Sequence, residues 1–113
     1  MVFGYDELKE CVKEDFCRFR YEMKYSVEHS ILATLNEYEH AEDFTETEGS
    51  IIYFSIALLL ISEGIGIESI KEKLIELIES EKLNTYRKEL KEEFSLLEED
   101  LRKLRPLLGV AEN

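Results

Sequence analysis

Hydrophobic residues recur along this chain at steps of three and four, which is the spacing of one face of an α-helix. Such a stripe predicts a first helix over about residues 5–21. A second predicted helix begins at Ser26, whose hydroxyl suits the N-cap position, and runs to about residue 40 or 42. Alternation with a period of two, which would indicate strands, is rare. The pattern therefore predicts an all-α fold.

The third predicted helix is apolar on nearly all sides. It begins near Thr45 or Thr47 and continues through IIYFSIALLLIS to Gly64. Thr45 and Glu48 stand in capping-box register at its start, and glycine suits the left-handed residue that follows a helix. A helix without a polar face must be surrounded by other helices. We therefore expect residues 47–63 to form the centre of a bundle.

Two further helices are predicted in the second half of the chain. A fourth covers about residues 65–80, with isoleucine and leucine on one side and lysine and glutamate on the other. A fifth runs from about Leu83 or Tyr86 to Arg105, where Pro106 is expected to stop it. The expected architecture is one all-α domain, residues 1–113, with about five helices around the central one.

Length and composition agree with this expectation. The 113 residues are 44% hydrophobic and 11% aromatic, which is enough to fill one core. The start of the chain is acidic where a secretory signal would be basic, and the longest apolar run is far shorter than the roughly 20 residues that cross a bilayer. Cys11 and Cys17 face different sides of one helix and cannot bridge each other. We therefore expect a cytoplasmic protein that does not enter a membrane.

Negative charge is concentrated in one region of the chain. The formal net charge is −12. Residues 25–70 contain nine acids and no lysine or arginine, whereas residues 81–113 hold eight acids and seven bases. This distribution repels nucleic acid phosphates and anionic membranes, so neither is an expected direct partner. A cationic protein would be attracted, although such acids can also serve solubility alone.

The densest acidic stretch, NEYEHAEDFTETE at residues 36–48, invites a search for a metal site. Glu37 and His40 form an E-x-x-H pair on one helix face, as in carboxylate-bridged di-iron bundles. Those bundles need a second such pair, and the other histidine, His29, has Ser26 three positions before it. The spacing of calcium loops and zinc motifs is also missing. We therefore assign no metal and no cofactor.

Catalytic motifs are missing as well. Neither histidine lies in the context of a catalytic triad, and the sequence has no G-x-S-x-G motif and no glycine-rich phosphate loop. With 26 acidic residues, suitably spaced carboxylate pairs occur by chance. We therefore assign no catalytic residues and do not expect an enzyme.

Four features follow one another from residue 27 onward. They are the LNEYE helix, an acid before the apolar IIYFSIALLLISEG helix, the segment IKEKLIELIE, and a last helix rich in arginine and leucine that closes in proline. Over about residues 27–108 this order resembles a family of small all-α immunity proteins of bacterial polymorphic toxin systems. The resemblance implies a cytoplasmic protein that binds and neutralises a cognate toxin without catalysis.

The resemblance and the charge pattern together suggest steric and electrostatic blockade of a toxin with a basic surface. A nuclease toxin, for example, needs a basic groove to hold phosphates, and an acidic protein would be attracted to it. Aromatic side chains among carboxylates are typical of an interface centre with a polar rim. The candidate partner-binding residues are Glu37, Tyr38, Glu39, Glu42, Asp43, Phe44, Glu46 and Glu48.

Two alternatives remain beside this hypothesis. One is a non-catalytic structural or regulatory helical protein that binds another partner, or a second copy of itself to form a homo-oligomer. The apolar stripe of the predicted last helix would suit self-association. The other is a carboxylate-bridged metalloprotein.

Overall fold

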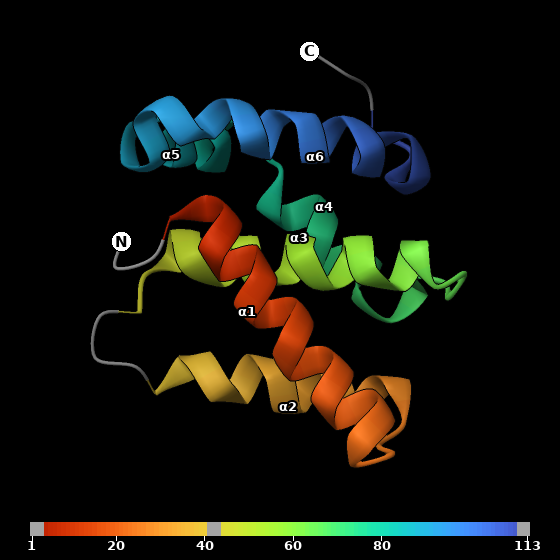
Figure 1. Ribbon diagram of the computed structural model, residues 1–113. Helices are drawn as coiled ribbons and strands as arrows, with labels where there is room; N and C mark the ends of the chain where they lie inside the picture. Colours follow the sequence, from red (N-terminus) through yellow and green to blue (C-terminus); the bar gives the residue numbers. More distant parts are fainter. Residues whose placement is uncertain (1–3, 41–43, 111–113) are drawn as a thin grey trace.

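The computed structural model describes residues 4–40 and 44–110, and its described residues form helices joined by turns (Figure 1). The α-helices are α1 (Tyr5–Cys17), α2 (Val27–Glu39), α3 (Glu46–Ser62), α4 (Lys71–Leu77), α5 (Ser80–Leu90) and α6 (Phe94–Leu108). Three shorter elements are the π-helical turn η1 (Arg18–Glu22) and the 3₁₀ turns η2 (Glu68–Ile70) and η3 (Lys91–Glu93). The predicted all-α class is confirmed.

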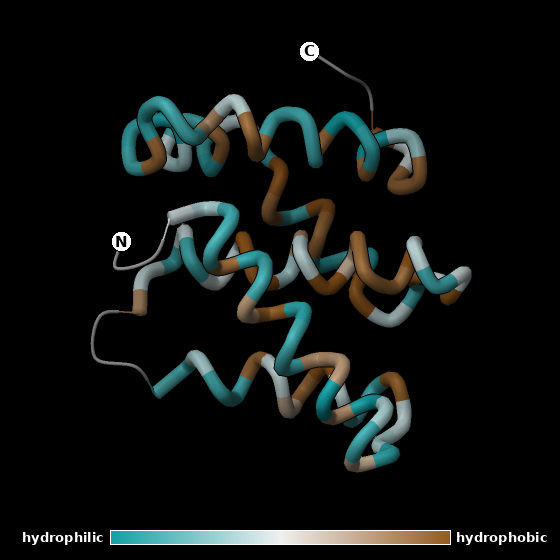
Figure 2. Tube along the Cα trace, in the orientation of Figure 1, coloured by the Kyte–Doolittle hydropathy of each residue, from teal (hydrophilic) through white to brown (hydrophobic). Residues whose placement is uncertain are grey.

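Helix α3 is the centre of the bundle, as its sequence predicts. It contacts α1, α2, α4, α5 and α6, and Figure 1 shows it as a middle layer between α2 and the α5–α6 pair, with α1 crossing over it. Ile51, Phe54 and Leu60 have no exposed surface. Each such side chain contributes about 1.5–3 kcal/mol on burial, and among the described helices α3 supplies the most buried apolar side chains. Figure 2 shows hydrophobic colour concentrated on α3 and α4, with hydrophilic colour along the outer side of α5 and α6.

The ends of α2 and α3 are fixed by the predicted capping residues. Ser26 Oγ accepts a hydrogen bond from the backbone N–H of His29 at 3.1 Å, and Thr45 Oγ1 accepts one from that of Glu48 at 3.1 Å. Gly64 follows α3 with φ +74°, a left-handed conformation that glycine adopts without steric cost. These caps determine where α3 begins, and hence where the side chains of its first turn lie.

The first helix differs from the prediction in its last turn. Regular α-helical bonding ends at Cys17, and in the wider turn that follows, the N–H of Met23 donates to the carbonyl of Arg18 at 2.9 Å. The wider turn keeps Phe19 in the core, with 8% of its surface exposed. Lys24 then adopts φ +58°, which reverses the chain toward α2.

The predicted long last helix is wrong as a single element. The chain forms α5 and α6 instead, and Lys91 interrupts the helix with φ +54°. Tyr86, Leu90, Phe94 and Leu97 are all buried, so the apolar spacing continues unchanged across the turn between the two helices. The spacing of apolar residues shows which side chains face the core. It does not reveal a turn between two helices when the buried residues on both sides of that turn keep the same spacing.

The proline near the end of the chain does not stop α6 either. Pro106 lies inside α6, which continues to Leu108 and ends where Gly109 adopts φ +72°. Proline removes one backbone hydrogen bond from the last turn. Leu108 is 4% exposed, and its burial holds that turn against the core. Within residues 4–40 and 44–110, no helix combines the length and the apolar character needed to cross a membrane.

Candidate functional site

The surface formed by α2, α3 and α4 is hollowed in three places that meet at Leu35 and Tyr53. One hollow is a cleft of about 300 Å³ that extends from these two residues to α5. The other two, of about 680 and 460 Å³, are both lined by Leu32. All three hollows share Leu35 and Tyr53. We call this surface the hollowed face and define it by Leu32, Leu35, Glu39, Tyr53 and Lys73.

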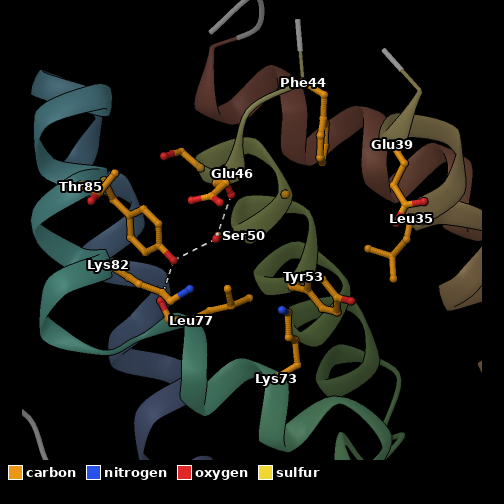
Figure 3. Close-up of a pocket in the computed structure, with 13 residues that line it drawn as sticks. Leu35, Glu39, Phe44, Glu46, Ser50, Tyr53, Lys73, Leu77, Lys82 and Thr85 are labelled. Carbon is orange, nitrogen blue, oxygen red and sulfur yellow. Dashed lines mark hydrogen bonds between the residues drawn. The ribbon is translucent and has the colours of Figure 1, made fainter. Parts of the chain in front are cut away.

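The cleft brings opposite charges to opposite sides. Figure 3 shows Glu39 and Phe44 on one side and the nitrogen ends of Lys73 and Lys82 directed into the cleft from the other. Glu46 lines the cleft from the first turn of α3. The helices α2 and α3 thus provide carboxylates, and α4 and α5 provide ammonium groups.

The floor of the cleft is held by a chain of hydroxyl contacts. The hydroxyl of Tyr86 donates to the carbonyl of Leu77 at 2.6 Å and lies 2.9 Å from Ser50 Oγ (Figure 3). Ser50 in turn donates to the carbonyl of Glu46 at 3.1 Å. Burial raises the pKa of the Tyr86 phenol above its ordinary value, so the hydroxyl stays protonated and remains a donor. These bonds fix α5 against α3 and α4.

The rim of the cleft depends on a close approach between Phe44 and α3. A Cβ atom added to Gly49 would lie 3.1 Å from Cζ of Phe44, which is closer than ordinary van der Waals contact. Glycine at this position therefore lets the ring lie directly against the backbone of α3. In this way Phe44 forms an apolar edge beside Glu39 and Glu46.

The structure gathers three of the candidate residues at the cleft. Glu39, Phe44 and Glu46 all line it, and both glutamates are exposed. Within the described ranges neither carboxylate has an ion-pair partner closer than 4 Å. Glu42 and Asp43 lie outside the described residues.

The other candidates on α2 contact η1 and α1. Glu37 Oε1 lies 3.3 Å from Nη2 of Arg18, whose guanidinium is shared with Asp15 at 3.1 Å. The hydroxyl of Tyr38 donates to Oδ2 of Asp15 at 2.6 Å. Burial and this hydrogen bond raise the pKa of Tyr38. Glu37 therefore joins α2 to η1 while it also lines one of the hollows, and Tyr38 joins α2 to α1.

Glu48 has a different place from the other acids. Only 6% of its surface is exposed, and the hydroxyl of Thr45 lies 3.3 Å from its Oε1. The backbone N–H of Glu48 donates to the same hydroxyl oxygen. Glu48 thus completes the cap of α3 and is not an exposed acid of the cleft.

Sequence reasoning missed several residues of this surface. Leu32 is 65% exposed and lies outside the apolar stripe of α2. An isolated leucine on the polar side of an amphipathic helix was the signal that could have identified it as a surface contact residue. Lys73, Lys82 and Tyr86 reach the cleft only through the packing of α4 and α5 on α3, for which their own sequence gives no signal.

The described residues contain no group of three or more histidine, cysteine, aspartate or glutamate side chains that could hold a metal ion. Both cysteines, Cys11 and Cys17, are free thiols. Burial and neighbouring carboxylates raise the pKa of each thiol, which lowers its reactivity.

Comparison with known proteins identifies the class of this chain. Residues 1–106 match the family described as Immunity protein Imm3. No significant match is found among curated proteins or among solved structures. The predicted resemblance to immunity proteins of toxin systems is therefore confirmed over nearly the whole sequence. The chain belongs to the Imm3 family of immunity proteins, which are non-catalytic toxin inhibitors, and it is not an enzyme.

Proposed function

We propose that this immunity protein neutralises its cognate toxin by covering a basic surface of the toxin with the hollowed face. The observation that carries the proposal is the meeting of three hollows at Leu35 and Tyr53. The exposed carboxylates of Glu39 and Glu46 lie at their edge, without an ion-pair partner among the residues that the structure describes. Concave surfaces that combine apolar and charged groups are typical binding sites.

Electrostatic attraction supports a basic partner. The net charge of −12 attracts a cationic protein from a distance, and the carboxylates of Glu39 and Glu46 lie where such a partner would dock. Glu42 and Asp43 adjoin these residues in the sequence and belong to the proposed contact. Attraction between exposed charges weakens as salt rises, because the Debye length shortens.

An apolar centre supports tight contact once the partner has arrived. Leu32 exposes 65% of its surface between hollows that are also lined by Leu35 and Tyr53. Side chains that become fully desolvated near the centre of an interface, inside a surrounding ring of weaker contacts, often contribute most to its stability. Phe44 adds a second apolar group at the cleft.

The proposed mechanism is steric and electrostatic blockade in the cytoplasm of the producing cell. A toxin that acts on a polyanion, such as a nuclease, presents a basic groove to its substrate. An acidic protein bound over that groove excludes the substrate and takes its place in the positive electrostatic potential of the groove. The toxin would come from a polymorphic toxin system, and no nucleic acid or membrane is part of the complex.

A toxicity rescue assay tests the proposal. The toxin encoded beside this chain is expressed in cells together with the wild-type protein or with the variant Leu32→Asp/Glu39→Gln/Glu46→Gln. The control variant, Leu107→Asp/Glu92→Gln/Glu99→Gln, carries the same changes at exposed positions of α6 and η3. We expect the control to protect the cells and the first variant to fail at equal abundance. Full protection by the first variant would contradict the proposal.

A further inference from the structure

The two lysines of the cleft have ammonium groups that lack close acceptors. Lys73 Nζ and Lys82 Nζ lie 3.7 and 3.8 Å from the same oxygen, Oε1 of Glu76. Charge-assisted hydrogen bonds are shorter, at about 2.7–2.9 Å. Within the described part of the chain neither ammonium group donates a hydrogen bond. Both are directed into the cleft (Figure 3).

A second polar group of the cleft also lacks a partner. Thr47 lines the cleft and is only 1% exposed. Its Oγ1 has no hydrogen-bond partner among the residues that the structure describes. Buried hydroxyl groups are nearly always hydrogen-bonded in folded proteins. Thr47 is an exception that lines the same cleft as the two lysines, and a polar group bound there can complete its hydrogen bonding.

The dimensions of the cleft limit what can enter. A helix with its side chains is about 10–12 Å across, whereas the cleft has a volume of about 300 Å³, so side chains of a segment can enter it and a whole helix cannot. The walls offer apolar contact from Leu35, Phe44 and Leu77. The lysines on one side favour an anionic group, and Glu39 and Glu46 on the other favour a cationic one. A segment with adjacent acidic and basic side chains fits both sides.

We infer that the cleft is a specificity pocket that binds a segment of the toxin through an acidic side chain. Lys73 and Lys82 hold its carboxylate by charge-assisted hydrogen bonds, and a neighbouring basic side chain of the segment faces Glu39 and Glu46. The inference rests on the proposed function, since the segment belongs to the toxin. Attraction by net charge requires only that the toxin be basic. The inference adds the requirement that the toxin also carry a carboxylate at one position.

This requirement predicts a different effect of removing a lysine from the one that long-range electrostatics predicts. Removal of a lysine makes the immunity protein more acidic and should speed its association with a basic toxin. If the lysine holds a carboxylate in the complex, its removal should instead speed dissociation. The rate that changes therefore distinguishes the pocket from general attraction.

The test measures the binding kinetics of a catalytically inactive form of the neighbouring toxin at physiological salt. We expect Lys73→Gln and Lys82→Gln each to raise the dissociation rate by about tenfold or more, as for loss of one partner of a desolvated pair. Lys88→Gln makes the same charge change at an exposed position on α5 and should alter that rate by less than about twofold. Circular dichroism and thermal unfolding establish that each variant is folded.

A mutant cycle then identifies the carboxylate on the toxin. Each exposed Asp or Glu of the toxin is replaced by its amide, and the replacement is measured against wild type and Lys82→Gln. We expect one position where the amide weakens binding to wild type about tenfold and weakens binding to Lys82→Gln much less. Equal dissociation rates for Lys82→Gln and Lys88→Gln, or no coupled carboxylate, would overturn the inference and leave the proposed function standing. If the wild-type protein does not bind the toxin, both fail.

Discussion

The hydroxyl of Tyr5 donates a hydrogen bond to Oδ2 of Asp100, 95 positions further along the chain. Lys9 Nζ lies 2.7 Å from the same oxygen. Asp100 is only 5% exposed, so its charge depends on these two partners from α1. The backbone N–H of Tyr5 also donates to Glu93 at 2.9 Å. The first helix and the last part of the chain are thus joined by polar contacts as well as by apolar packing.

Replacement of Asp100 should therefore destabilise the fold. We expect Asp100→Ala to lower the free energy of unfolding by about 2–4 kcal/mol, because it leaves the buried hydroxyl of Tyr5 and the ammonium of Lys9 without their acceptor. Urea denaturation measures the change. Glu99→Ala, at an exposed position of the same helix, should change stability by less than about 0.5 kcal/mol. An equal effect of the two substitutions would show that the buried contacts contribute little.

Buried tyrosines should make the protein sensitive to alkaline pH. Burial, and then the hydrogen bond to Asp100, raise the pKa of Tyr5, and burial and the bond to Asp15 raise that of Tyr38. In the unfolded chain these phenols have pKa values near about 10 and lose their protons first. The stabilisation is therefore fully present below about pH 10 and falls above it, by about 1.4 kcal/mol per pH unit for a buried phenol such as Tyr5.

Urea denaturation between pH 8 and 11 tests this expectation, with nearly constant stability at the lower end and a decline at the upper end. Tyr5→Phe should be less stable at pH 8, because it leaves Asp100 with fewer partners, and should decline less steeply above pH 10. If the slope of Tyr5→Phe equals that of wild type, the Tyr5 phenol is not the group that resists ionisation.

The hydroxyl of Tyr86 should stabilise the junction of α3, α4 and α5. Tyr86→Phe removes the bond to the Leu77 carbonyl and the contact with Ser50, at a cost of about 1–2 kcal/mol of unfolding free energy. Thermal or urea unfolding measures the loss. Tyr21→Phe is the matched control, since Tyr21 is 52% exposed, and it should be nearly neutral. A neutral Tyr86→Phe would mean that the floor of the cleft does not depend on these bonds.

Leu32 should contribute to toxin binding and little to folding. Its side chain is 65% exposed, so Leu32→Ala should change stability by less than about 0.5 kcal/mol. At the centre of the proposed interface the same change should weaken toxin affinity by about tenfold or more. Leu107→Ala, at a leucine that is 51% exposed on α6, is the control and should leave affinity unchanged. Titration calorimetry of both variants decides between a contact residue and an incidental surface leucine.

Local signals in the sequence predicted much of the fold. The apolar run of α3 required a central position, and Ser26, Thr45 and Gly64 fixed the ends of α2 and α3 by their own hydrogen bonds or backbone conformation. The turn at Lys91 was not predictable from spacing, because the buried residues on both sides of it keep the same phase. Periodicity gives the face of a helix more directly than its ends.

The site was only partly predictable, because the order of charged residues in the sequence does not show which charged side chains lie close together in the folded protein. Residues 25–70 contain no lysine or arginine, yet folding places Arg18 beside Glu37 and brings Lys73 and Lys82 to the cleft. Burial of Glu48 likewise follows from the local cap geometry at Thr45, which turns an acid inward. In the folded protein Glu39 and Glu46 are thus the exposed acids that line the cleft. The density of acids in the sequence does not distinguish these two from their neighbours.

The rate of association with the toxin at several salt concentrations tests the central claim most directly. The claim is that the carboxylates of Glu39 and Glu46, at the edge of the hollowed face, attract the toxin. For the wild-type protein we expect the association rate to fall steeply as salt rises. Glu39→Gln/Glu46→Gln should associate more slowly at low salt and with a weaker salt dependence. Glu92→Gln/Glu99→Gln, with the same loss of charge at exposed positions on η3 and α6, should resemble wild type more closely. Identical rates and salt dependence for the two double variants would contradict the claim.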